Sequence, residues 1–312
     1  MAELGARIWE VFGHDIAYDF SRLDAAQDGF NGLQPLSSDE AAGLASFDDE
    51  FEVRFVYNSN AIEGSTLTIG ETALVLDGEF VPDRPGRDYF AARGSADGMA
   101  YYKRALLEGR SLSEDLVKDI HERTALDSQP AARGLYRRHP VYLRGSQTVP
   151  ANWVQVPSLM ADLVSAWTVS RQHPAFKAAA FHAMFENIHP FGDGNGRAGR
   201  LLLNYMLEQA GYPPIALTAE HRGQYLKALE DWQVREHAEP LVALIDTALL
   251  RELTARTSSV MQTRLPVLTD DRAGFDSINP AVAITEAPTR PNTKARRGVN
   301  EAPPTGLEPV TL

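Results

Sequence analysis

HPFGDGNGRAGR, residues 189–200, places three glycines between a histidine and an arginine, and a second arginine follows one helical turn later. Glycines let backbone N–H groups point at an anion, and the amino-terminal end of a helix favours negative charge. Arg197 and Arg200 fall on one face of the first turn of the next helix, where cations are unfavourable unless an anion lies between them. The stretch therefore predicts a phosphate site between two helices.

Two side chains of the same stretch suit phosphate chemistry. Asp193 offers a hard oxygen ligand for Mg²⁺ that bridges phosphate oxygens, and His189 has the pKa range of a general base. A Walker A loop is excluded because Arg197 stands where lysine is required. An EF-hand is excluded because Phe191 and Leu202 stand where acids are required. The remaining alternative is a glycine-rich turn that only joins two helices.

Composition limits the class of protein. The chain has 312 residues with 30 basic and 42 acidic side chains, and its net charge of −12 argues against broad nucleic-acid binding. There is no cysteine, which excludes disulfides, zinc–thiolate sites and a cysteine nucleophile. No apolar run reaches the roughly 18–20 residues of a membrane span, and the amino-terminal stretch lacks an apolar signal core. We expect a cytoplasmic protein without membrane or nucleic-acid partners.

Most of the chain shows helical periodicity. The apolar stripe in residues 47–64 predicts a helix that ends at Gly64. Thr68 and Glu71 form a capping box that predicts a short helix through residue 76. Further helices are expected over residues 89–108, from Ser113, and over 156–169, 176–188, 198–209, 222–231 and 240–256.

Two segments depart from this pattern. Val141–Leu143 lie between Pro140 and Gly145 and predict a short β-hairpin, or flap, within residues 134–150. From Pro266 onward prolines recur and Phe275 is the only aromatic residue, so apolar burial cannot offset the ordering entropy. We expect an all-α fold with one small β-hairpin flap and an N-terminal helical region over residues 1–108. A core follows over residues 109–256, and a C-terminal extension over 257–312 is disordered from about residue 266.

Residues 189–200 resemble the signature of the Fic family, HPF-x-[DE]-GNGR-x-x-R, and match it at every fixed position. The similarity runs from about Asn58 to Ile245 and includes GLYR before the flap and GYPP after the signature. The resemblance implies a helical Fic core that transfers AMP from ATP to a Ser, Thr or Tyr hydroxyl of a target protein, or of the enzyme itself. It also implies Mg²⁺ as cofactor and is compatible with a homodimer.

The resemblance assigns a role to each residue of the signature. His189 would take the proton of the attacking hydroxyl, and Asp193 would hold Mg²⁺ against the α- and β-phosphates. The phosphate ligands would be the amides of Gly194, Asn195 and Gly196 and the guanidinium groups of Arg197 and Arg200. The flap, around residues 141–146, would align the target backbone by strand addition. The nucleotide would also contact Leu143, Arg144, Gly145, Ser146 and Tyr225.

SNAIEG, residues 59–64, raises a second question. Glu63 ends a predicted helix, where the helix dipole disfavours a carboxylate unless a cation such as Arg200 or Arg197 lies nearby. A solvated acid at a helix end is the alternative. The stretch resembles the Fic inhibitory motif [ST]-x-x-x-E-[GN] through Ser59, Glu63 and Gly64. This resemblance implies that Glu63 pairs with Arg200 and displaces the γ-phosphate; whether Glu63 also assists AMP removal stays open.

The resemblance is incomplete around the nucleotide base. Family members often place a Tyr-Tyr pair and an Asn there, whereas this chain has Tyr225, Leu226 and Gln233. Tyr225 could equally be a core aromatic. Alternatives are therefore a Fic-type transferase of UMP, phosphate or phosphocholine, and a nucleotide-sensing regulator. The complete signature favours a triphosphate, and His189 with Asp193 argues against sensing alone. The sequence leaves the target protein and the oligomeric state open.

Overall fold

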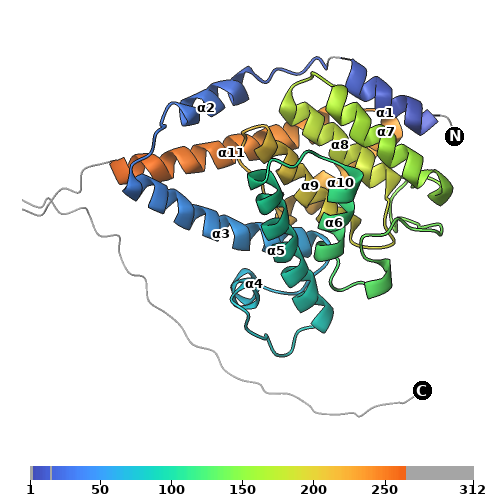
Figure 1. Cartoon of the computed structure of the whole chain (residues 1–312), viewed down its shortest axis with the longest axis horizontal. Helices are drawn as coiled ribbons and strands as arrows, with labels where there is room; N and C mark the ends of the chain where they lie inside the picture. Colours follow the sequence, from blue (N-terminus) through green and yellow to red (C-terminus); the bar gives the residue numbers. More distant parts are fainter. Residues whose placement is uncertain (1–2, 15, 265–312) are drawn as a thin grey trace, which may run out of the picture. The chain divides into compact units, whose positions relative to one another are not determined.

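The computed structural model describes residues 3–14 and 16–264, which form helices joined by turns and loops (Figure 1). The helices are α1 (Glu3–Gly13), α2 (Ser21–Asn31), α3 (Ser38–Ile62), α4 (Ile69–Leu76), α5 (Gly86–Leu107), α6 (Glu114–Thr124), α7 (Val156–Val169), α8 (Pro174–Ile188), α9 (Asn195–Gln209), α10 (Arg222–Arg235) and α11 (Glu239–Arg264), with short 3₁₀ turns η1 (Pro130–Ala132), η2 (Trp153–Gln155) and η3 (Ala219–His221). The predicted all-α class is confirmed.

The predicted β-hairpin does not form within the part of the chain that the structure describes. Residues 140–150, the flap segment, are an irregular loop with a turn at Arg144–Gly145. Two of its backbone N–H groups bond to side chains instead of a second strand: Gln147 N–H donates to the Glu230 carboxylate at 2.9 Å, and Thr148 N–H to Ser146 Oγ at 3.1 Å. Ser146 N–H donates to the Leu143 carbonyl within the turn at 3.3 Å. The prediction that this segment is not helical is confirmed. The predicted pairing of two strands is wrong, because side chains take the hydrogen bonds that a second strand would have taken.

Local capping determines where the helices begin. The predicted box of Thr68 and Glu71 starts α4. Ser37 and Glu40 form a second box, so α3 begins at Ser38 and not at the predicted residue 47. Each box satisfies N–H groups that a helix start leaves without partners.

Helices α8 and α9 form the centre of the fold. Nearly every residue of α8 is buried, and α8 packs against α7, α9, α10 and α11. Helix α5 packs closely against α6 and α9 at Gly98, where a Cβ would lie 2.4 Å from Thr124 Oγ1 and 2.7 Å from Leu201 Cδ1. Helix α3 packs against α5 and α11 and reaches α9 at its carboxyl end. This arrangement brings residues 59–64 beside residues 189–200.

None of the helices in residues 3–14 and 16–264 has both the length and the apolar character that a membrane span requires. The extension predicted to be disordered from residue 266 lies outside the described residues. Helix α11 continues to Arg264, beyond the expected end at residue 256. The boundaries at 108/109 and 256/257 stay predictions.

Candidate active site

His189 ends α8 with a strained backbone. Its φ of 51° and ψ of 62° lie in the left-handed region, and its N–H donates to the Phe185 carbonyl at 2.8 Å. Its Nδ1 lies 3.3 Å from the backbone carbonyl of Glu186. Because a carbonyl only accepts, Nδ1 carries the hydrogen and Nε2 keeps a lone pair. Burial lowers the pKa of His189 to about 4, so the imidazole is neutral at pH 7 and can accept a proton.

Arg137 holds the backbone around this histidine. Its side chain is buried, and its Nε donates to the His189 carbonyl at 2.8 Å. Its other nitrogens donate to the carbonyls of His139, Ala151 and Ile188. One guanidinium therefore joins the end of α8 to both ends of the flap segment. Sequence reasoning noted GLYR, which contains this arginine, but assigned it no role.

The loop between α8 and α9 is held by two side chains. His121 accepts from Gly134 N–H at Nδ1 (3.0 Å), so its Nε2 donates to the Asp193 carbonyl at 2.8 Å. Its ring stacks on Phe191 with centroids 3.6 Å apart. The Asn195 amide bonds to both the N–H and the carbonyl of Phe191, each at 2.9 Å. The Asn195 side chain is therefore structural, and only its backbone is free to act on a ligand.

The amino-terminal end of α9 is an anion site that a protein carboxylate occupies. The first N–H groups of α9 lack acceptors within the helix, and the helix dipole favours negative charge there. A Cβ on Gly196 would come within 2.2 Å of Glu63 Oε1. The Glu63 carboxylate thus lies directly against the helix end at the position that a glycine leaves open.

Arg200 binds this carboxylate and the end of α3. Its Nη2 donates to Glu63 Oε1 at 2.7 Å and to the Ser59 carbonyl at 2.8 Å, and its Nε donates to Ser59 Oγ at 2.9 Å. The Arg200 side chain is 3% exposed and that of Glu63 is 45% exposed. Burial opposes the charge of Arg200, but Glu63, together with Tyr225 and Glu186, more than offsets this and raises the pKa of Arg200. The sequence had left Arg200 and Arg197 as alternatives, and the structure pairs Glu63 with Arg200.

Arg197 has a different partner. Its Nη1 donates to Asp127 Oδ1 at 2.7 Å, and its buried Nε has no partner among the described residues. Asp127 comes from the loop after α6 and was not singled out from the sequence. Asp127 can be identified only from the folded structure, where it lies within hydrogen-bond distance of Arg197. The two arginines expected to share a phosphate chain are therefore bound to separate acids.

Asp193 fits a magnesium ion that a nucleotide brings with it. The side chain is exposed and accepts from Gly194 N–H at 2.8 Å and from Ser128 Oγ at 3.0 Å. Within residues 3–14 and 16–264 no group of three or more acidic or histidine side chains could hold a metal ion. Mg²⁺ often takes one carboxylate and completes its shell with phosphate oxygens and water, so a single aspartate is sufficient.

Two cavities meet at Glu63. One, of about 470 Å³, is lined by Leu143–Ser146 of the flap segment, Tyr225 and Leu226 of α10, and Glu63, Glu186, His189, Gly196 and Arg200. The other, of about 330 Å³, contains Asp127, Asp193 and Arg197 and also reaches His189. Together the two cavities are lined by the predicted general base His189, the predicted phosphate ligands and part of the flap segment. Both cavities are lined by Glu63, His189 and Gly196.

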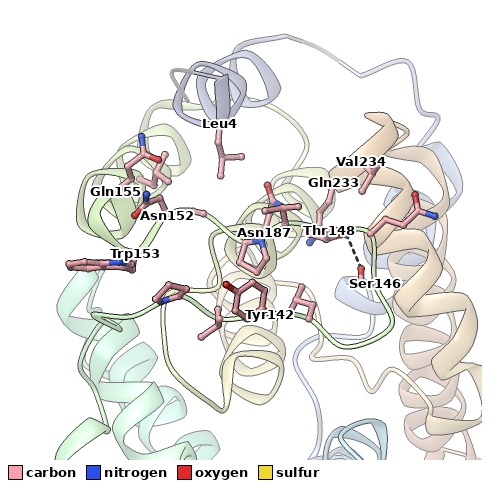
Figure 2. A pocket seen from close by; sticks show the side chains of 18 of the residues that line it. Leu4, Tyr142, Ser146, Thr148, Asn152, Trp153, Gln155, Asn187, Gln233 and Val234 are labelled. Atoms are coloured by element: carbon pink, nitrogen blue, oxygen red, sulfur yellow. Dashed lines mark hydrogen bonds between the residues drawn. The ribbon is translucent and has the colours of Figure 1, made fainter.

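The largest of the three cavities that border the flap segment or the start of α9 does not contain the phosphate-site residues. Figure 2 shows this space of about 900 Å³, with Tyr142, Ser146 and Thr148 of the flap segment facing Leu4 of α1 and Trp153. Leu143 and Ser146 line both this cavity and the 470 Å³ cavity. We place the chemistry in the smaller cavities, because the general base and the arginines lie there.

Two α10 side chains have partners in the protein. Tyr225 is buried; its hydroxyl lies 2.7 Å from His182 Nε2 and its ring stacks on that histidine. The Gln233 amide donates to the Ala183 carbonyl at 3.0 Å and accepts from Thr148 Oγ1 at 2.8 Å. Tyr225 is thus a core aromatic that also lines the cavity, and the Gln233 amide is already engaged. Sequence reasoning assigned no role to His182.

Comparisons with known proteins agree on one family. Residues 111–207 match the model of the Fic/DOC family. The Protein adenylyltransferase Fic of Culex quinquefasciatus is 32% identical over 218 residues, which cover 68% of this chain and 42% of that protein. The Drosophila erecta protein of the same name is 27% identical over 263 residues, covering 82% and 52%. The chain thus spans about half the length of these curated relatives.

Solved structures show the same similarity. A Fic-domain-containing signaling protein from Bacteroides thetaiotaomicron has a TM-score of 0.70 and 29% identity, with coverage of 77% of this chain and 97% of that one. Fic-1 from C. elegans has a TM-score of 0.66 and 26% identity, with coverage of 77% and 70%. The likeness therefore includes helices on both sides of the matched residues 111–207.

Proposed function

The chain belongs to the Fic/DOC family, and on that premise we propose that it is an autoinhibited protein adenylyltransferase. It transfers AMP from ATP to a hydroxyl of a target protein or of itself. The observation that supports this most directly is the meeting of a neutral, partly buried His189 with Arg200 and the amino-terminal end of α9 in one cavity. The names of the curated relatives point to the same reaction.

The reaction needs a base, charge stabilisation and a leaving group. Nε2 of His189 takes the proton of the target hydroxyl, whose oxygen attacks the α-phosphorus of ATP. The bond from the α-phosphorus to the bridging oxygen breaks, and pyrophosphate leaves. The N–H groups at the start of α9 and the guanidinium of Arg200 stabilise the phosphate charge. Mg²⁺, when bound at Asp193, supplies further positive charge to the phosphates.

Glu63 inhibits this reaction by occupying the site. Its carboxylate is bound to Arg200 and lies against Gly196 at the start of α9. A γ-phosphate in the same place would meet a like charge and an occupied guanidinium. ATP therefore binds productively only after Glu63 withdraws. Ser59 supports the inhibitory arrangement because its hydroxyl and carbonyl hold the same guanidinium.

The flap segment is the expected docking place of the target. It borders both the 470 Å³ cavity and the largest cavity, and much of it is exposed. An extended target backbone could add to it by main-chain hydrogen bonds, which leave the target sequence largely unspecified. The base of the nucleotide is less constrained than the phosphates, because the Gln233 amide has protein partners. UTP and CTP are therefore useful competitors in the assay.

Label transfer from α-labelled ATP with Mg²⁺ tests the proposal. Self-modification makes the chain its own substrate, so no target is needed. We expect label on Glu63→Gly, little on the wild type and none on Glu63→Gly/His189→Ala. Binding of ATP without label transfer in any variant would contradict the adenylyltransferase and favour another transferred group. Label that persists without His189 would contradict the assigned base.

A further inference from the structure

Glu186 is a buried carboxyl that the proposed mechanism does not use. It lies on α8 one turn before His189 and is 8% exposed. Its Oε1 is buried without a hydrogen-bond partner, and a Cβ on Gly199 would lie 2.4 Å from this oxygen. Its Oε2 lies 3.9 Å from His189 Nδ1, beyond hydrogen-bond distance. A buried, unpaired carboxyl destabilises a fold, so its presence calls for a functional reason.

Glu186 lines the same cavity as the proposed phosphate ligands. The 470 Å³ cavity has Gly196 and Arg200 at its phosphate end, and Leu143 and Leu226 on its apolar side. Helix α8 packs against both α9 and α10 and contributes Glu186 to the lining of this cavity, with its Oε1 close to Gly199 of α9. In a nucleoside triphosphate, the ribose lies between the phosphates and the base. Among the polar side chains that line this cavity, Glu186 is the carboxyl with a buried oxygen that has no partner in the described part of the chain, so it is a candidate to meet the sugar.

The charge state of Glu186 is compatible with a triphosphate. Burial raises its pKa to about 8; Arg200 opposes this rise and Glu63 adds to it. The titratable groups that face it are Arg200 of α9, Glu63 at the end of α3, Tyr225 of α10, and His182 and His189 of its own helix. At pH 7 the carboxyl is mostly protonated and does not repel phosphate. A protonated carboxyl both donates and accepts a hydrogen bond, as a ribose hydroxyl does.

We propose that Glu186 binds a hydroxyl of the donor's ribose and makes the site selective for ribonucleotides over deoxyribonucleotides. The inference rests on the proposed nucleotide site and adds the group that reads the sugar. No covalent bond is made or broken by Glu186. Its role is recognition, so its removal should change the preference among sugars more than the chemistry.

The test compares the dissociation constants of ATP, 2′-deoxyATP and 3′-deoxyATP with Mg²⁺, measured on the full chain with Glu63→Gly to open the site. We expect ATP to bind about tenfold more tightly than one of the two deoxynucleotides, the value of one hydrogen bond. In Glu186→Leu this ratio should fall to about one. Glu186→Gln keeps a donor and an acceptor and should keep most of the ratio.

Leu226→Ala is the matched control, because Leu226 lines the apolar side of the same cavity. It should weaken all three nucleotides by a similar factor and leave their ratio unchanged. Two results would overturn the role of Glu186 but leave the proposed function intact, provided that ATP still binds and label is transferred. One is an unchanged ratio of dissociation constants in a folded Glu186→Leu protein. The other is equal affinity of the Glu63→Gly parent for all three nucleotides. Failure of every nucleotide to bind would overturn the proposed function as well. Thermal unfolding of each variant establishes that it is folded.

Discussion

Replacing Glu63 by glycine is expected to release the transferase, because one carboxylate occupies both Arg200 and the amino-terminal end of α9. Glu63 is the C-cap residue of α3 with φ of −84°, and glycine tolerates this conformation. The substitution removes the ion pair and leaves the bonds between Arg200 and Ser59 available. The guanidinium therefore stays in place to receive a phosphate.

The contacts of Glu63 set the size of the effect. The 2.7 Å bond to Arg200 is charge-assisted, and such bonds contribute about 1.5–3 kcal/mol. Because the Glu63 side chain is 45% exposed, screening favours the low end of that range, and the helix end adds about 0.5 kcal/mol. A total of about 2 kcal/mol corresponds to a roughly 30-fold preference for the inhibited position. If the open and inhibited positions differ only by these contacts, Glu63→Gly should raise the initial rate by that factor.

The assay is the initial rate of label transfer from α-labelled ATP, compared between wild type and variants at one protein concentration. Glu63→Gln keeps a neutral hydrogen bond and should raise the rate roughly fivefold, since loss of the charge weakens the contact by about 1 kcal/mol. Ala61→Gly loosens the same helix end without touching Arg200 and controls for fraying of α3. A folded Glu63→Gly protein with the wild-type rate would refute the reasoning. So would an equal gain in Ala61→Gly.

Three further predictions concern the proposed general base His189 and the side chains around it. Arg137→Met removes the donors to four carbonyls and should lower the free energy of unfolding by about 3 kcal/mol, which lowers Tm by roughly 6–12 °C. Arg138→Met, at an exposed position, is the control. An equal Tm for both variants would contradict the role of Arg137. Because burial lowers the pKa of His189 to about 4, the base stays unprotonated as pH falls, and the Glu63→Gly rate should persist to about pH 5.5; an acid limb centred near the ordinary histidine pKa of about 6.5 would contradict this. Burial raises the pKa of Glu186 to about 8, with a contribution from the Glu63 charge, so Glu63→Gly lowers this pKa but leaves the effect of burial. ATP affinity of the Glu63→Gly protein should fall as the pH rises and the carboxyl becomes charged, while Glu63→Gly/Glu186→Gln should lack this fall; identical pH profiles would contradict the protonated state.

The site was predictable where its residues are neighbours in sequence. HPFGDGNGRAGR predicts a candidate base, a glycine-rich helix start and two arginines from twelve consecutive residues, and His189, Gly196 and Arg200 of this stretch line one cavity. The position of Glu63 at a helix end predicted a cation nearby, and the structure places Arg200 there. The supporting residues could not be found this way. Asp127 acquires its role only by meeting Arg197, and His121 by meeting Asp193 and Gly134.

The sequence by itself predicted most of the helices, the Thr68–Glu71 cap and the glycine-rich loop, because periodicity, capping boxes and glycine conformations depend on residues three or four positions apart. Tertiary structure decided which charges meet. Glu63 and Arg200 come together because α3 packs across α5 and ends against α9, and Arg197 is drawn to Asp127 by the packing of α6 on α9. Tertiary structure also decided the hydrogen bonds of the flap segment, where Glu230 of α10 takes the place of a second strand. Such pairings depend on the burial of whole helix faces, and no local pattern encodes them.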